Sequence, residues 1–563
     1  MSILLGIDLG TTNCSVTAID ENGNTTVVKN RDNEYITPSA VYFTPIPNNY
    51  IIGKRAKEKA STDPNNLVTL VKREMGKTKE EVRFSKMDRK YNPYIFWGRT
   101  FSPEEISSKI LNQLKQDAQA VLNCEIRQAV ITCPAYFGQN EKEATRLAGE
   151  LAGLDILEVI PEPTAACLNY GTLSNRENER IFVFDLGGGT FDITIVDVST
   201  GAAGKRIDVK CCGGDSKLGG ADWDYYMLDY MLDRFNRKYH IDLAFEEGPE
   251  KDTTYGKLTL DVEKAKKELS KPDITETTIS MEYGGARLDE VITREKYAEI
   301  TEQLTEQCRS YCQNLLSENG MTWYDIDTIL MVGSMSNCIF IQDALRRWSG
   351  KDVQFGIINP KTCVSEGASI RAYSKICAKE GRQTVVKTHA ETFKYDSEAA
   401  DEIAKIEALT GTSQRVSTVI ESATSVLPAS ICLKLLHKGE SFAYKMLKQN
   451  QPYPCSYVRD FPLSRDNMSE VILTVLEGEK EDPNYCMELG NAVLPLEGSH
   501  LKGDKVKVSF DVDENGIIQV SGLDLKTNRS VKAEIRRKNT LSDEEIARAK
   551  ADLDNDEFEF ELG

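Results

Sequence analysis

Phe184-Asp-Leu-Gly-Gly-Gly-Thr-Phe-Asp192 is the stretch that decides the fold. It lies between two apolar runs of strand type, 181–184 and 193–198. Three consecutive glycines leave no side chain over the turn, so an anion can approach the backbone N–H groups directly. Asp185 and Asp192 bracket the turn, and a carboxylate beside a phosphate is favourable only if a cation lies between them. The stretch therefore predicts a phosphate and metal site between two strands.

The same design occurs near the start of the chain. Leu4-Leu-Gly-Ile-Asp-Leu-Gly-Thr-Thr-Asn13 joins an apolar run to a glycine and threonine turn, and residues 15–19 return as a strand. The repeat predicts a duplicated fold that clamps one polyphosphate between its halves. Asp8 and Asp185 would then orient Mg²⁺ through its water shell, because Mg²⁺ gives up water reluctantly.

Two other phosphate-binding motifs do not fit. No G-x-x-x-x-G-K-[ST] sequence occurs, which excludes a P-loop. The chain returns from each turn as a strand rather than as a helix, which excludes the dinucleotide-binding Rossmann turn.

Composition limits the partners and the location. The chain has 563 residues, enough for several domains, and its 40% hydrophobic and 28% charged residues are ordinary for a globular protein. A formal net charge of −19 makes nucleic acid and anionic membranes poor partners, and no apolar run approaches the length of a membrane span. The 14 cysteines show no zinc-ligand spacing, and the first strand begins too early for a signal peptide. We therefore expect a cytoplasmic protein.

The pattern of apolar residues divides the chain into parts. Strands and helices alternate through the first part, which indicates an α/β domain. A polar segment follows, then alternating strands, then a short helix that Ser542-Asp-Glu-Glu545 caps before an acidic end. The predicted parts are an α/β domain at 1–379, a connecting segment with a short helix at 380–422, a β domain at 423–540 and a C-terminal helix and tail at 541–563.

The motifs together resemble those of a known family. Pro161-Glu-Pro-Thr-Ala-Ala166 and Leu330-Met-Val-Gly-Ser334, with the two turns, are similar to the actin, hexokinase and heat-shock ATPase superfamily. Within it, the chain closely resembles the seventy-kilodalton heat-shock chaperone family of DnaK type, over nearly all of 1–375 and again over about 423–550. The further matching motifs are Val71-Lys-Arg73, Pro134-Ala-Tyr-Phe137, Leu218-Gly-Gly220, Glu263-x-x-Lys266 and Leu476-Glu-Gly-Glu479.

The resemblance implies a fold and an activity. The fold would be a duplicated actin-like (ribonuclease-H-like) two-lobed α/β ATPase, followed by an all-β sandwich that binds peptides and a short C-terminal helix. The activity would be that of an ATP-dependent chaperone, which hydrolyses ATP slowly with Mg²⁺ and switches between ATP and ADP states. The implied partners are extended polypeptide segments, a J-domain co-chaperone and a nucleotide exchange factor.

The resemblance also implies catalytic roles for individual residues. Lys72 matches the catalytic lysine, where a cation can position the attacking water and offset γ-phosphate charge. Glu162 and Asp185 match carboxylates that order Mg²⁺ and water, and Thr190 offers a hydroxyl near the γ-phosphate. The implied metal ligands are Asp8, Asp185 and Asp192, with K⁺ as a second candidate ion beside Mg²⁺.

The nucleotide and switch positions follow in the same way. Glu263, Lys266 and Ser270 match the group that holds ribose and adenine, and their spacing places them on one helix face, although an exposed charged face has the same pattern. Pro134 matches the family's switch proline, and Lys142 stands where an arginine relay is expected. The other implied nucleotide contacts are Gly10, Thr11, Thr12, Asn13, Gly187, Gly188, Gly189, Gly333, Ser334 and Asn337.

The chain departs from the family's pattern in several places. Asn337 replaces an arginine that stacks on adenine, which predicts either weaker affinity or packing by Met335 instead. The linker lacks the leucine-rich signature, and its nearest candidate is Val416-Ser-Thr-Val-Ile-Glu421. The helical lid is largely missing. Asp460 is expected where an apolar residue lines the peptide pocket, and a carboxylate there would disfavour apolar side chains.

Two alternatives to an ATP-hydrolysing chaperone remain. One is an exchange factor or scaffold of the same fold that holds ATP but hydrolyses little of it; the catalytic residues argue against it, and the altered linker and Asp460 favour it. The other is a sugar kinase on the same ATPase fold, in which the β domain would have no role.

Overall fold

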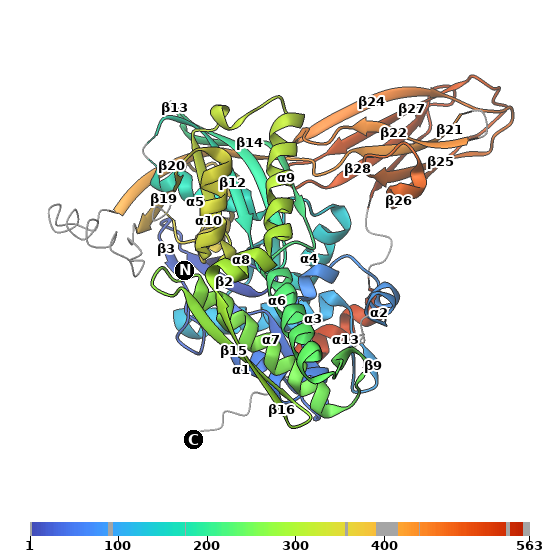
Figure 1. Cartoon of the computed structure of the whole chain (residues 1–563). Coiled ribbons are helices and arrows are strands. Elements are labelled where there is room, and N and C mark those ends of the chain that lie inside the picture. The colour runs from blue at the N-terminus through green and yellow to red at the C-terminus, as the bar shows by residue number, and fades with distance from the viewer. Residues whose placement is uncertain are drawn as a thin grey trace.

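The chain forms a two-lobed body from which a β-sandwich projects (Figure 1). The computed structural model describes residues 3–87, 94–174, 176–354, 358–389, 415–437, 440–535 and 541–554. The short helix expected within 380–422, at 396–409, lies outside these residues. None of the described helices combines the length and apolarity that a bilayer crossing requires.

The first lobe is built on a sheet with the first Gly/Thr turn at one end. Strand β1 is buried, runs parallel to β10 and antiparallel to β2, and the turn joins β1 to β2. In spatial order the strands are β11 (Asp155–Pro161), β10 (Gln128–Cys133), β1 (Leu4–Asp8), β2 (Asn13–Ile19) and β3 (Thr25–Val27), with β4 (Thr37–Pro38) also paired to β2.

The second lobe repeats this arrangement. Strand β12 runs parallel to β17 and antiparallel to β13, and the Gly-Gly-Gly turn joins β12 to β13. In spatial order the strands are β18 (Val353–Gln354), β17 (Thr328–Val332), β12 (Asn178–Leu186), β13 (Phe191–Gly201), β14 (Gly204–Asp215), β20 (Arg415–Val426) and β19 (Thr384–His389). The strand order and directions around β12 match those around β1, so the repeat predicted from the two turns is present in the topology.

Helices join and cover the two sheets. Helices α5 and α11 pack on each other and on strands of both lobes, and their side chains share one core with the inner faces of the two sheets. Ser102 and Glu105 form the expected capping box at the start of α3. The helices of this framework are α3 (Pro103–Leu122), α4 (Gln139–Leu151), α5 (Glu162–Leu173) and α11 (Cys363–Lys379).

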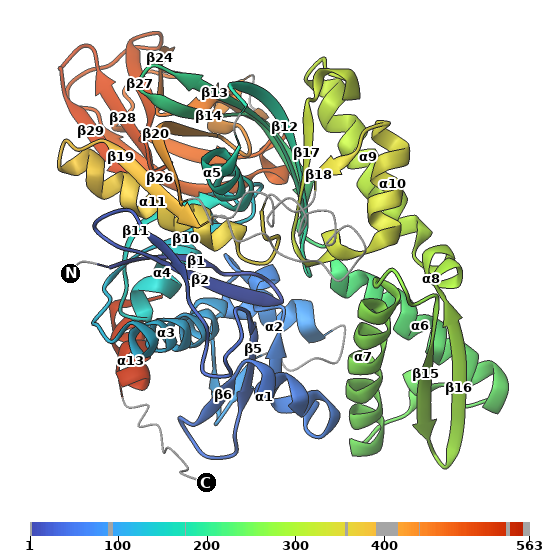
Figure 2. The same ribbon diagram turned by 90° about the vertical axis from the view of Figure 1, so that its left-hand side faces the viewer.

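Each lobe carries an additional group of elements beside its sheet (Figure 2). In the first lobe these are β5 (Ala40–Phe43), β6 (Tyr50–Ile52), α1 (Lys54–Glu58), η1 (Lys59–Ser61), η2 (Pro64–Asn66), β7 (Leu67–Thr69), η3 (Val71–Glu74), α2 (Lys79–Met87), β8 (Ile95–Phe96) and β9 (Arg99–Thr100). In the second lobe these are α6 (Gly220–Tyr239), η4 (Leu243–Phe245), α7 (Pro249–Leu269), β15 (Glu276–Tyr283), β16 (Ala286–Thr293), α8 (Arg294–Ile300), α9 (Glu302–Glu318), η5 (Trp323–Asp325), η6 (Ser334–Asn337) and α10 (Ile339–Ser349).

The segment predicted to be a connection is part of the second sheet. Strand β19 pairs with β20, and β20 pairs in parallel with β14, with Ile207 opposite Ala423. The alternation of Val416-Ser-Thr-Val-Ile-Glu421 suits a strand, and β14 offers it an open sheet edge. The prediction of a linker across all of 380–422 is therefore wrong for these two strands, which extend the sheet of the second lobe.

The β domain consists of two packed sheets around one core. One sheet has the order β22 (Glu440–Leu447), β21 (Ile431–His437), β25 (Glu470–Glu477), β26 (Met487–Pro495). The other has the order β24 (Cys455–Pro462), β27 (Lys505–Val512), β28 (Ile518–Asp524), β29 (Ser530–Glu534), and β23 (Pro452–Tyr453) pairs with β20. Within the described part of the chain, β22 and β24 are edge strands.

The last helix, α13 (Asp543–Asp554), returns to the first lobe and lies beside α3 in both views (Figures 1 and 2). Its apolar face packs against Leu147 and Leu151 of α4. Lys79 forms an ion pair with Glu545, and Arg99 forms ion pairs with Asp552 and with Glu105 of α3. The helix therefore packs on the two-lobed body.

Candidate functional site

The two glycine turns face each other across the junction of the lobes. A Cβ on Gly188 would lie 2.1 Å from Thr12 Oγ1, and a Cβ on Gly189 would lie 2.1 Å from Thr11 Cγ2. No side chain fits between the turns at these positions, so glycine is required there for packing. The structure therefore brings together the two segments that the sequence predicts to clamp a polyphosphate.

The second turn is held in place by the start of α6. The N–H groups of Gly220 and Ala221 donate to the carbonyl oxygens of Gly187 (3.0 Å) and Gly188 (2.7 Å). Arg73 Nε donates to the carbonyl oxygen of Gly189 at 2.7 Å. With its carbonyls bonded in this way, the turn is held although its three glycines have no side chains of their own.

Lys72 is buried at the base of the cleft. It lies in η3, which follows a Leu70 with φ of 57°, an unusual conformation for a residue with a branched side chain. Its Nζ donates to Glu162, the first residue of α5. Burial alone would lower the pKa of Lys72, but Glu162 and Asp8 raise it above its usual value, so this lysine is a cation.

Carboxylates surround this lysine. Burial and the neighbouring Glu162 raise the pKa of Asp8 to about 7. Burial and the same neighbour raise the pKa of Asp185 and of Asp192 well above the usual range. The N–H of Ala135 donates to Asp192 Oδ1 at 2.6 Å, while Oδ2 is buried and has no hydrogen-bond partner among the residues that the structure describes. One lysine does not balance these acidic groups, so the site suits a bound cation.

The geometry of these carboxylates fits an indirectly held Mg²⁺. Among the described residues, no group of three His, Cys, Asp or Glu side chains is close enough together to hold a metal ion directly. Mg²⁺ in proteins keeps several waters and takes phosphate oxygens as ligands. Asp8, Asp185 and Asp192 would hold such an ion through its waters.

The predicted nucleotide residues of α7 line the other side of the cleft. Lys266 Nζ donates to Asp224 Oδ2 (2.6 Å) and to the carbonyl oxygen of Gly220 (2.7 Å). Ser270 Oγ lies 2.8 Å from the carbonyl oxygen of Lys266 and 3.0 Å from Cys338 Sγ. Lys266 is therefore held by the start of α6 and Ser270 by Cys338 after the 333–337 loop, and their contacts with ribose and adenine stay a prediction.

Glu263 faces the opposite lobe. Its carboxylate pairs with Lys57 at 2.6 Å and with Lys267 at 2.7 Å. Burial alone would raise its pKa, but these two ammonium groups lower the pKa of Glu263 to about 2. Glu263 therefore closes the cleft by an ion pair between α1 and α7.

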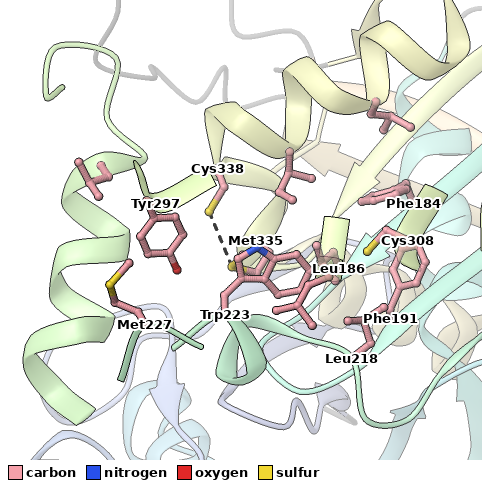
Figure 3. Packing of buried hydrophobic residues seen from close by; sticks show 14 of the residues in the cluster. Phe184, Leu186, Phe191, Leu218, Trp223, Met227, Tyr297, Cys308, Met335 and Cys338 are labelled. Carbon is pink, nitrogen blue, oxygen red and sulfur yellow. Dashed lines mark hydrogen bonds between the residues drawn. The ribbon is translucent and has the colours of Figure 1, made fainter. Parts of the chain in front are cut away.

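The loop at 333–338 is filled by sulfur-containing side chains. Met335 is buried beside Trp223, and its Sδ lies 3.7 Å from Cys338 Sγ (Figure 3). A Cβ on Gly220 would lie 3.1 Å from Met335 Sδ. Asn337 Nδ2 donates to the carbonyl oxygen of Ser334 at 3.2 Å. Met335 thus packs in the core beneath the loop, and both outcomes expected for the missing arginine, weaker affinity or packing of Met335 on adenine, stay predictions.

Further contacts hold the two lobes together. Arg73 forms a two-pronged ion pair with Asp222 at 2.5 and 3.2 Å. Helix α7 touches η1 so closely that a Cβ on Gly256 would lie 1.7 Å from the carbonyl oxygen of Ala60. A cavity of about 510 Å³ lies beside this contact, between Ser61 and the β15–β16 hairpin, and the glycine turns do not line it.

The predicted switch residues connect the site to the β domain. Pro134 lies just before α4 and directly precedes Ala135, whose N–H donates a hydrogen bond to Asp192. Lys142 of α4 is buried, with its Nζ 5.8 Å from the centre of the Tyr453 ring. Gln139 bonds the β domain twice, through its N–H to Glu477 Oε2 (3.2 Å) and through Nε2 to the carbonyl oxygen of Gly516 (2.5 Å).

A family model described as Hsp70 protein matches residues 4–388 and 400–559. The chain belongs to the Hsp70 family. Members of this family are ATPases and chaperones, and they bind ATP and ADP with Mg²⁺. The facing turns, the buried Lys72 and the mixed α/β architecture agree with this membership.

Within the Hsp70 frame, some functional contacts were not predicted from the sequence. Lys57 and Arg73 of the first lobe form ion pairs with Glu263 and Asp222 of the second lobe. Asp222 and Asp224 flank the buried Trp223, and this Asp-Trp-Asp pattern at the start of α6 is the signal that could have identified their partners.

The place of Asp460 in a peptide pocket stays a prediction. Asp460 is exposed and lies opposite the exposed Lys507 of β27. Its neighbour Phe461 lies opposite the buried Val506 and faces the core side of the sheet. Because successive strand residues face opposite sides, an alignment error of one residue exchanges the two faces.

Proposed function

We propose that this chain is an ATP-dependent molecular chaperone of the Hsp70 type, which hydrolyses ATP with Mg²⁺ to switch the binding of extended polypeptide segments. The observation that carries the proposal is the buried Lys72–Glu162 pair among Asp8, Asp185 and Asp192, between two facing glycine turns. We assign residues 1–379 to an actin-like two-lobed ATPase, supported by the matching strand order of the two sheets.

The chain's own residues would divide the work of hydrolysis. The N–H groups of the two turns would hold the phosphates, and Lys72 would place its charge against the γ-phosphate and the attacking water. Glu162 would hold Lys72 and order that water, with the Thr190 hydroxyl nearby. Mg²⁺, with K⁺ as a further candidate, would neutralise the phosphates and the acidic side chains. A J-domain protein and an exchange factor would act on this cycle, in a cytoplasmic location.

The route from the ATP site to the peptide site would run through α4. Asp192 contacts Ala135 before this helix, and Gln139 at its start contacts the β domain. Strand β20 supports the same coupling, because it joins the sheet of the second lobe directly to the sandwich. The departure from the family's linker signature therefore does not argue for uncoupled domains.

Single-turnover hydrolysis of ATP, with and without a J-domain protein, tests the proposal. Lys72→Ala should lower the rate by roughly 10²-fold or more while nucleotide still binds. Lys77→Ala is the matched control, since Lys77 lies in the same segment but pairs with Glu74 near the surface. No hydrolysis by the unaltered chain under either condition would favour the alternative of a nucleotide-binding exchange factor or scaffold.

A further inference from the structure

Arg459 is a charged residue on the core-facing side of an edge strand. In the antiparallel pair of β24 with β27, Arg459 lies opposite Val508 and Phe461 lies opposite Val506, and both valines are buried. Residues directly opposite each other in such a pair share one face of the sheet. Arg459 therefore lies on the face that is turned toward the second sheet, where a charge is unexpected.

The guanidinium is stacked at the open edge between the two sheets. Its Cζ lies 4.6 Å from the centre of the Tyr444 ring and 5.8 Å from that of Phe461. These two rings meet edge to face at 5.8 Å, with Tyr444 on β22 and Phe461 on β24. Both rings are half-buried, whereas Arg459 is exposed. The edge thus presents an aromatic surface with a cation on it (edge strands in Figure 1).

Arg459 has no acidic partner in the described part of the chain, where it forms ring contacts but no ion pair. A guanidinium that stacks through its flat face keeps N–H donors free at its edge, in the geometry that a carboxylate accepts. An inward-facing charge also protects an edge strand from aggregation. Protection requires only the charge, whereas carboxylate recognition requires the planar group, so the two roles can be separated by substitution.

We propose that Arg459, stacked on Tyr444 and Phe461, makes the β-sandwich select extended polypeptide segments that carry Asp or Glu beside apolar residues. The inference rests on the proposed function, since it names the substrate class of the same peptide site. The rings accept the apolar side chain, the guanidinium accepts the carboxylate, and edge strands suit an extended backbone. A lysine or arginine in the segment is disfavoured because it meets a like charge.

The test is the affinity of the full chain, with ATP and with ADP, for three peptides that share one apolar centre and are flanked by Glu, Gln or Lys. Fluorescence anisotropy with the same neutral dye on each peptide gives the dissociation constants. We expect the Glu peptide to bind about five- to tenfold more tightly than the Lys peptide at low salt, as an exposed charge contact allows.

Three variants assign the preference to the guanidinium. Arg459→Gln should bring the ratio of the two affinities close to one, and Arg459→Lys should restore only part of it. Asp460→Asn is the matched control, because it changes the net charge on the same strand but on the opposite face, and it should leave the ratio unchanged.

The outcomes separate this inference from the proposed function. Equal or tighter binding of the Lys peptide by the unaltered chain, or an unchanged ratio in Arg459→Gln, overturns the acidic preference while peptide binding stands. Full restoration by Arg459→Lys overturns the role of the planar group. Failure of all three peptides to bind with either nucleotide refutes the proposed peptide-binding function and this inference with it.

Discussion

Glu477 is expected to make docking of the β-sandwich depend on pH. Its carboxylate is buried at the end of β25 against the start of α4, where it accepts a hydrogen bond from the N–H of Gln139. Its Oε1 has no hydrogen-bond partner within the described part of the chain. Burial and Glu141 raise the pKa of Glu477, while Gln139 and Lys142 partly offset them, and the result is about 7. The substitution Glu477→Gln keeps an oxygen for the Gln139 N–H but removes the titration.

The size and sign of the effect follow from this pKa. A rise from the ordinary 4.5 to about 7, at 1.36 kcal/mol per pH unit, means that ionisation of Glu477 costs the docked arrangement about 3 kcal/mol. Docking therefore takes up a proton between pH 4.5 and 7. Docking should therefore strengthen as the pH falls from 7 toward 4.5, and it should be weakest and nearly independent of pH above 7. In Glu477→Gln, this part of the pH dependence should disappear, and docking at pH 8 should be stronger.

Small-angle X-ray scattering of the full chain between pH 5.5 and 8.5, with each nucleotide, measures the docked fraction. Glu479→Gln is the control, since Glu479 lies two residues away and pairs with Lys445 at the surface. The control should keep the pH dependence of the unaltered chain. Identical pH profiles for the unaltered chain and Glu477→Gln, or weaker docking of the variant at pH 8, would refute the reasoning.

Further variants test the cleft, the glycine turn and the last helix. Lys57→Met removes the ion pair with Glu263, so release of a fluorescent ADP, measured by stopped flow, should be about fivefold faster, equivalent to roughly 1 kcal/mol. Lys54→Met, at an exposed position of the same helix, is the control. An unchanged release rate in Lys57→Met, or an equal change in Lys54→Met, would contradict this prediction. Gly189→Ala places a Cβ against Thr11, so calorimetry should show at least about tenfold weaker ATP binding, and Thr11→Ser, which removes Cγ2, should recover part of the loss. Leu151→Ala leaves a cavity between α4 and α13 and should cost about 2–5 kcal/mol in urea unfolding. The cost should be smaller in a chain that ends at residue 540, and equal costs would show that α13 does not pack on Leu151.

The centre of the site was predictable because short-range patterns determine it. Each turn carries its glycines, its aspartate and its flanking strands within a few residues, so the repeat could be recognised without the fold. The spacing of Glu263, Lys266 and Ser270 likewise placed them on one face of α7. The spacing does not say which part of the protein that face meets. In the structure, Glu263 forms an ion pair with Lys57 of the other lobe.

Contacts between distant segments were the part that the sequence did not reveal. Strand β20 was interpreted as a connection because its partner, β14, is far away in the chain, and pairing with an available edge overrides a polar composition. The register of β24 was a second such contact: Asp460 lies on the exposed face, opposite Lys507, and a shift of one residue exchanges the two faces of a strand. That exchange also concealed Arg459, the charged residue that does face inward.

Helix α13 and strand β20 attach the β-sandwich to the two-lobed body at both of its ends. A domain with two attachments stays at a high effective concentration near its docking surface when one attachment dissociates, because the remaining attachment prevents diffusion away. Rebinding of the dissociated attachment is then intramolecular. The loss of one attachment therefore changes the docked fraction at equilibrium only slightly. Combined loss of both attachments should consequently weaken docking by much more than the product of the two separate effects, so the short C-terminal helix acts as a second anchor for the sandwich.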